Sequence, residues 1–136
     1  MVEVIGFERR RAVTELADRL DAIDRRLEAI AGELREVQPV RPGALTLVSY
    51  RCGKGCAGCP HPRWLQWSQA RSPDREMRRK LVGHPTTHPL HRIRRTGVFE
   101  NTAYIVRRLV TEAQKLAKQR ELILTHVAAA RRSLRY

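Results

Sequence analysis

Two apolar seams in heptad spacing, one near each end of the chain, constrain the fold more than any other feature. In the first third, apolar residues recur at alternating intervals of three and four. This spacing predicts one long amphipathic helix. Pro39 and Pro42 follow the seam and end the helix, because proline cannot continue it. The seam consists of Val13, Leu16, Leu20, Ile23, Leu27, Ile30, Leu34 and Val37.

The last third repeats this pattern with one charged interruption. Its seam consists of Val106, Leu109, Ala113, Leu116, Arg120, Ile123, Val127, Ala130 and Leu134. Arg120 must reach a carboxylate or extend to solvent, and it can also fix the register. Neither helix buries its apolar stripe alone, so the two predict an antiparallel, coiled-coil-like hairpin. The alternative is a dimer in which the N-terminal helix pairs with its copy, and both arrangements together make a four-helix bundle.

Charge divides the chain into the same three parts. The 136 residues carry a net charge of +13 and suffice for one modest core. Residues 1–37 are slightly acidic, whereas residues 38–98 hold 12 basic and 2 acidic side chains, a net charge of +10. Such a concentration of positive potential attracts polyanions. We expect an N-terminal heptad helix in 1–43, a basic insert in 44–98 and a C-terminal heptad helix in 99–136.

The sequence of the basic insert predicts a small β-structure. Residues 44–51 and 63–68 predict two strands joined by a cysteine-rich turn with three glycines. Residues 72–83 predict a short helix, and residues 91–96 a third strand or an arm. The expected fold class is therefore mainly α, a long antiparallel helical hairpin with a small zinc-binding β-hairpin or knuckle inserted at its tip. Trp64 and Trp67 are expected to form core beneath the knuckle; the alternative is that they are platforms on which bases stack.

The turn offers a set of metal ligands. Three thiols and an imidazole within ten residues fit a Cys₃His zinc site, in which one loop wraps the ion. An iron–sulfur cluster is disfavoured because its usual fourth thiolate is missing. A downstream group of histidines is the alternative source of the fourth ligand. The predicted ligands are Cys52, Cys56, Cys59 and His61, and the alternative donors are His84, His88 and His91.

Arginines surround this turn. The planar fork of arginine suits phosphate groups and the edges of guanine, so the sequence predicts nucleic-acid binding, with DNA favoured over RNA. The candidate contacts are Arg51, Lys54, Arg63, Arg71, Arg75, Arg78, Arg79, Lys80, Arg92, Arg94 and Arg95.

Several classes of protein are disfavoured. No run of 18 apolar residues is present and no secretory signal is visible, so we expect no membrane segment. Three clustered cysteines do not form a disulfide framework, and they favour a reducing, cytoplasmic compartment. No nucleophile–base pair or cluster of carboxylates points to an enzyme.

The segment 50–67 also resembles a known group of proteins. It reads Tyr-Arg-Cys-Gly-Lys-Gly-Cys-Ala-Gly-Cys-Pro-His-Pro-Arg-Trp-Leu-Gln-Trp. In this segment and in its helix–strand–strand–helix layout, the chain resembles a family of small, uncharacterised bacterial proteins associated with transposons and other mobile elements. The resemblance implies a nucleic-acid-binding accessory protein of a mobile element. The alternative is a non-catalytic adaptor whose helices recruit a recombinase, replication or conjugation partner.

Overall fold

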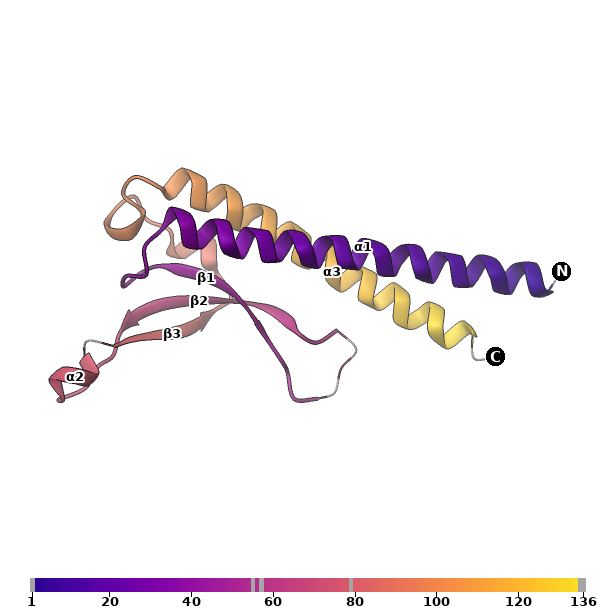
Figure 1. Ribbon diagram of the computed structural model, residues 1–136, viewed down its shortest axis with the longest axis horizontal. Helices are drawn as coiled ribbons and strands as arrows, with labels where there is room; N and C mark the ends of the chain where they lie inside the picture. The colour runs from indigo at the N-terminus through magenta and orange to yellow at the C-terminus, as the bar shows by residue number, and fades with distance from the viewer. Residues whose placement is uncertain (1, 55, 57, 79, 135–136) are drawn as a thin grey trace.

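Two long helices and a three-stranded antiparallel sheet make up the structure, a computed structural model (Figure 1). It describes residues 2–54, 56, 58–78 and 80–134. The elements are α1 (Val2–Val37), β1 (Leu45–Tyr50), β2 (His61–Gln69), α2 (Arg75–Arg78), β3 (Leu81–Thr86), the 3₁₀ turns η1 (Pro89–Arg92) and η2 (Gly97–Phe99), and α3 (Ala103–Leu134).

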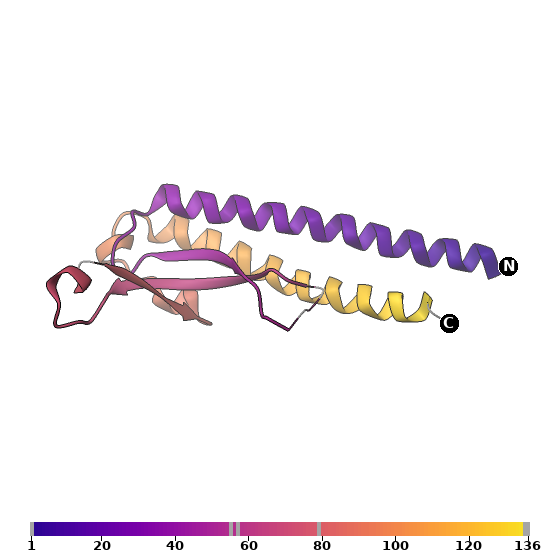
Figure 2. The ribbon, with the colours of Figure 1, turned by 60° about the horizontal axis from the view of Figure 1, so that its bottom comes forward.

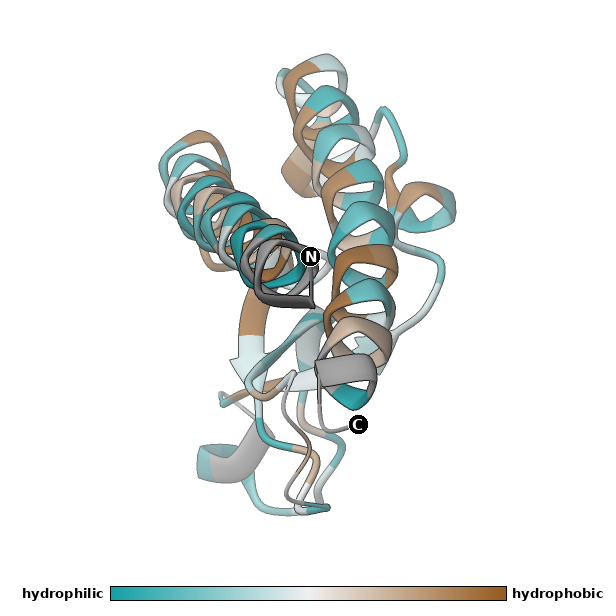
Figure 3. Cartoon of the chain, turned by 90° about the vertical axis from the view of Figure 1, so that its right-hand side faces the viewer, coloured by the Kyte–Doolittle hydropathy of each residue, from teal (hydrophilic) through white to brown (hydrophobic). Residues whose placement is uncertain are grey.

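The two heptad seams form the core, as predicted. α1 and α3 run antiparallel, with both chain ends at the same end of the pair (Figures 1 and 2). Hydrophobic residues recur along both helices, and hydrophilic residues lie at the positions between them (Figure 3). Ile30 and Leu34 of α1 are fully buried, as are Val106 and Val110 of α3. None of the described helices combines the length and the apolar character that crossing a membrane requires.

Ion pairs across the two helices fix their register. Arg26 of α1 donates from Nε and Nη2 to the two carboxylate oxygens of Glu112 on α3, over 2.7 and 2.8 Å. Its Nη1 donates to Glu33 over 3.0 Å. The hydrogen bonds from Arg26 to Glu112 hold the pKa of Glu112 below its usual range. A bidentate pair of this kind has a specific geometry and therefore favours one register of the two helices.

A buried glutamine joins the end of α1 to the start of the sheet. Gln38 is 2% exposed. Its side-chain amide donates to the Leu45 carbonyl and accepts the Leu45 N–H over 3.1 Å, as a neighbouring strand would. Between the two residues the chain reverses at Gly43, whose φ of +95° lies in the left-handed region that favours glycine.

Replacing Gln38 by leucine should destabilise the protein by about 1–3 kcal/mol, because the N–H and C=O of Leu45 would stay buried without partners. The matched control is Gln119→Leu, since Gln119 is an exposed glutamine of α3. Urea unfolding of both variants measures the difference. Equal stabilities for the two would show that the amide contributes nothing to the junction.

The sheet lies along one face of the helix pair rather than beyond its tip. The insert starts and ends at the tip, but β1 turns back beneath the helices (Figure 1). Leu45 and Leu47 point inward and join the helix core, and Trp64 of β2 packs against it. The expectation that the whole insert sits at the tip was therefore wrong. Apolar residues alternate along β1, and burying them requires contact with the helices.

The second half of the insert also differs from the prediction. The helix expected in 72–83 shrinks to α2, and the third strand is β3 rather than residues 91–96, which begin within η1. β3 pairs antiparallel with β2, so that Gly83 lies opposite Trp67. A Cβ on Gly83 would lie 3.1 Å from the side chain of Leu65. Gly83 therefore lies within a strand, where its lack of a side chain leaves room for Leu65 and Trp67, and it does not end a helix.

Candidate metal centre and basic surface

The four predicted ligands lie together in the turn between β1 and β2. We call residues 51–60 the cysteine loop; residues 55 and 57 lie outside the described part. The three sulfurs and the His61 imidazole lie within 4.8 Å of one another. Cys52 Sγ is 3.2 Å from Cys59 Sγ, and Cys56 Sγ is 3.6 Å from Cys59 Sγ and 3.0 Å from His61 Nε2. This geometry can hold a metal ion.

Local backbone structure brings the ligands together. β1 ends just before the loop and β2 begins at His61, so the hairpin register sets Tyr50 opposite His61. Gly53 turns the chain with a φ of +75°. The Cys52 N–H then points at Cys59 Sγ over 3.4 Å. Backbone donors of this kind stabilise thiolates.

The pKa values of Cys52 and Cys59 are shifted in opposite directions. A hydrogen bond from the backbone of Lys54, together with the Cys59 side chain, lowers the pKa of Cys52 to about 6. The backbone N–H of Cys52 lowers the pKa of Cys59, but the Cys52 side chain and burial outweigh it and leave that pKa raised. Metal binding requires the thiols to lose their protons, and the lowered pKa of Cys52 favours that loss at this residue.

The alternative histidine donors lie elsewhere. His84 belongs to β3 and lies opposite Gln66 in the sheet. His88 and His91 stack on each other beside η1, with ring centroids 5.6 Å apart. Within the described residues, His61 is the one histidine in the cluster with the cysteines.

Arg120 connects the cysteine loop to both helices. Its side chain is 5% exposed, and its Nε donates to Asp24 Oδ1 of α1 over 2.8 Å. Its Nη2 donates to the carbonyl oxygens of Gly58 and Pro60, over 2.7 and 2.9 Å. The interruption in the seam thus reaches a carboxylate, as predicted. No pattern in the amino-acid sequence indicated the second role of Arg120, which is to donate to two loop carbonyls.

The loop lies directly on α3. Gly58 is buried, and a Cβ placed on it would lie 2.8 Å from the side chain of Leu124 and 3.3 Å from His61. Beside this contact, a groove of about 540 Å³ separates α1 from β1 and from the loop; Glu28, Ser49 and Pro62 are among its lining residues. The candidate metal centre is therefore built against the helix pair and does not project freely.

The candidate nucleic-acid contacts fall into three groups rather than one patch. One group surrounds the cysteine loop, a second lies at the α2 end of the sheet, and a third follows η1 at the tip of the helix pair (Figure 1). In order, the groups are Arg51, Lys54 and Arg63; Arg71, Arg75 and Lys80; and Arg92, Arg94 and Arg95. Arg79 and the side chain of Arg78 lie outside the described residues.

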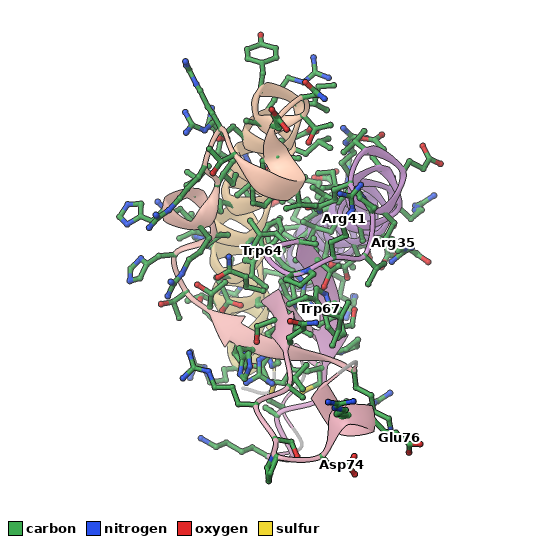
Figure 4. All side chains as sticks on the ribbon, turned by 90° about the vertical axis from the view of Figure 1, so that its left-hand side faces the viewer. Arg35, Arg41, Trp64, Trp67, Asp74 and Glu76 are labelled. Carbon is green, nitrogen blue, oxygen red and sulfur yellow. The ribbon has the colours of Figure 1, made fainter. Side chains whose placement is uncertain are left out.

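These nine side chains are all exposed, and none makes an ion pair within the described part of the chain. The acidic residues of the insert, Asp74 and Glu76, lie together at the α2 end (Figure 4). Asp74 Oδ1 accepts the Glu76 N–H over 3.0 Å. The positive charge of the insert is thus left largely uncompensated.

The two tryptophans lie on opposite faces of the sheet. Trp64 packs against the core, as expected, and lies between the sheet and the helices (Figure 4). Trp67 is half-buried on the other face, where its Nε1 donates to Thr46 Oγ1 over 2.9 Å. The odd spacing of the two residues gives this result, because side chains alternate along a strand.

Comparison of the chain with protein-family models, with curated proteins and with solved structures gave no match.

Proposed function

We propose that this chain is a nucleic-acid-binding accessory protein, with DNA as the preferred partner, whose sheet is stabilised by a structural zinc ion. The observation that carries this proposal is the set of nine exposed cations without carboxylate partners. Exposed Arg and Lys side chains displace the counterions of a phosphate backbone, and this release supplies most of the affinity in such complexes. The proposal assigns no reaction.

Zinc is the metal that best suits the ligands. Three thiolates and an imidazole select zinc over the harder magnesium and calcium ions. Zinc–sulfur bonds of about 2.3 Å give a tetrahedron with sulfur–sulfur edges of about 3.8 Å. The separations of 3.2 and 3.6 Å are close to that length, so small side-chain rotations would seat the ion. Four protein ligands leave no open position, which is typical of a structural site.

The biological setting is inferred only from the resemblance stated above, in residues 50–67 and in the layout of the chain. On that basis we propose that the protein acts with a mobile element, in the cytoplasm, as an accessory to the enzymes that move or copy DNA.

The electrostatic part of the proposal is tested by reversing charges far from the cysteine loop. Arg71→Glu with Lys80→Glu should weaken the binding of a DNA duplex about tenfold or more at 0.1 M salt and flatten the salt dependence. Ala70 and Lys80 are joined by a backbone hydrogen bond of 3.0 Å, which brings the two substituted positions to one end of the sheet. Fluorescence anisotropy at two salt concentrations gives both quantities.

Lys115→Glu with Lys118→Glu is the matched control, because both residues are exposed on α3 and the net charge changes equally. Equal weakening by both double variants would indicate an effect of net charge alone. DNA binding that is absent at low salt would overturn the proposed function.

A second candidate is the adaptor role, which one observation favours. Leu122 is 62% exposed on α3. It borders a shallow groove with Leu16 and His126 near the chain ends of the helix pair. Apolar side chains (Leu16, Leu122 and Ile123) and polar ones (Arg19, Gln119 and His126) line this groove together. A mixed surface of this kind suits a second amphipathic helix, either from another copy of this chain or from a protein partner. A complex that forms without DNA and survives high salt would favour this role.

A further inference from the structure

The sheet has an uncovered face opposite the helices. β1, β2 and β3 lie on one side of the helix pair, and neither of the two long helices in the described part of the chain covers their other side (Figures 1 and 2). We call this side the outer face. Because Leu45, Leu47 and Trp64 point inward, the alternate positions point outward. The outer-face residues used below are Thr46, Val48, Tyr50, Arg63, Leu65 and Trp67.

The indole of Trp67 lies across this face. On one side, its Nε1 donates to Thr46 of β1 over 2.9 Å. On the other side, a Cβ on Gly83 of β3 would lie 3.4 Å from its Cζ3 and Cη2 atoms. β2 lies between those two strands. An indole that reaches both neighbouring strands lies over the sheet, so one of its ring faces points outward.

A second aromatic group lies near the other end of the outer face. Tyr50 is 38% exposed, and the Arg63 guanidinium lies 4.8 Å from its ring centroid. Since Tyr50 is opposite His61, Tyr50 and Trp67 are separated by about 20 Å along the strands. Leu65 and Val48 are half-buried between them. The outer face is thus an apolar and aromatic track with a cation in it.

Basic groups flank both ends of the track. Arg51 follows Tyr50 directly, and Arg71 and Lys80 lie at the opposite end, where β2 ends and β3 begins. Aromatic rings beside a line of cations suit bases that have left a duplex, because each base can stack while its phosphate meets a cation. A duplex offers such a face only its phosphates, since its bases are stacked internally.

We propose that the outer face binds single-stranded nucleic acid, with bases stacking on Trp67 and Tyr50 and the backbone contacting Arg63 and the flanking cations. This inference rests on the proposed function and assigns its ligand. For Trp67 it adopts the stacking alternative, whereas the favoured sequence-based expectation placed both tryptophans in the core.

The test compares a labelled oligonucleotide of about 12 thymidines with a duplex of equal length, in the same buffer. Full-length, metal-loaded protein should bind the single strand more tightly than the duplex. Trp67→Leu and Tyr50→Leu should each weaken single-strand binding roughly tenfold without changing its salt dependence, because no phosphate contact is lost. Trp64→Phe is the matched control on the inner face and should bind with unchanged affinity.

The control variant provides a second readout. Trp64 and Trp67 are the two tryptophans of the chain, so Trp64→Phe leaves Trp67 as the sole indole. Its fluorescence should be quenched as the oligonucleotide binds. This measurement and Tyr50→Leu decide the question even where Trp67→Leu does not fold.

The outcomes distinguish failure of the outer-face assignment from failure of the proposed nucleic-acid-binding function. Equal binding of both probes, with no effect of either substitution and no quenching, would overturn the outer-face assignment and leave the proposed function standing. Binding of neither probe would overturn both.

Discussion

Removing the proposed zinc ion should unfold the cysteine loop and the adjoining ends of β1 and β2, while the two long helices stay folded. The candidate ligands span only residues 52–61, and without the ion only weak contacts such as the Cys52 N–H bond to Cys59 Sγ hold them together. A metal ion present at 1,000 times its dissociation constant stabilises a protein by about 4 kcal/mol. For a domain of this size, that loss lowers the melting temperature by roughly 10–20 °C.

Two histidine variants give the matched comparison. His61 Nε2 lies 3.0 Å from Cys56 Sγ, whereas His88 stacks on His91 outside the cluster. His61→Ala should lose most of its metal and melt like the chelator-treated protein. His88→Ala should keep one zinc per chain and the parent melting temperature. Metal analysis, helical circular dichroism and thermal melting measure these effects.

Chelator-treated protein that melts within 2 °C of the untreated protein would exclude a structural ion. Loss of metal from His88→Ala, with His61→Ala still loaded, would show that the fourth ligand comes from the downstream histidines.

The second large effect is expected from Arg120→Met. The substitution keeps most of the apolar stem but removes three hydrogen bonds, those to Asp24, Gly58 and Pro60. Breaking a buried charged network typically costs 3–5 kcal/mol. Asp24 is 45% exposed and can be solvated again, so we expect about 3 kcal/mol, most of it from the loop carbonyls that lose their donor. Urea unfolding of metal-loaded protein measures this loss.

Arg120→Met should also weaken metal binding, because Arg120 would no longer hold the cysteine loop against α3. Lys118→Met, on an exposed position of the same helix, controls for the substitution and should change neither stability nor zinc affinity by a measurable amount. Asp24→Asn should be milder than Arg120→Met, since both loop carbonyls keep their donor. Equal losses of stability for Asp24→Asn and Arg120→Met would show that the ion pair with Asp24 is the dominant interaction of Arg120.

The helices were predictable because their signal is periodic and long. Eight seam positions in 25 residues define one face of α1, and proline marks its end. The interruption at Arg120 predicted either a carboxylate partner or a side chain that extends to solvent, and the structure has the first, with Asp24 as the partner. That Cys52, Cys56, Cys59 and His61 lie together was also predictable, since glycine-rich spacing within one turn needs no knowledge of the tertiary structure.

The arrangement of the insert was not predictable from local pattern. β3 has the sequence Leu-Val-Gly-His-Pro-Thr, and its glycine and proline resemble a loop. It becomes a strand because β2 offers it a pairing edge and because Gly83 accommodates the Trp67 ring. The contact of the cysteine loop with α3 joins residues 60 positions apart, through backbone carbonyls that every residue possesses. No side-chain pattern can reveal such a contact.

Proline at position 85 has a consequence for self-association. β3 is an edge strand of the sheet, and Pro85 lies opposite Leu65 of β2. Proline carries no N–H, and it occurs in edge strands because it interrupts the row of donors that an incoming strand needs. A second molecule therefore finds no complete template there, and copies of this protein are hindered from joining edge to edge into a continuous intermolecular sheet.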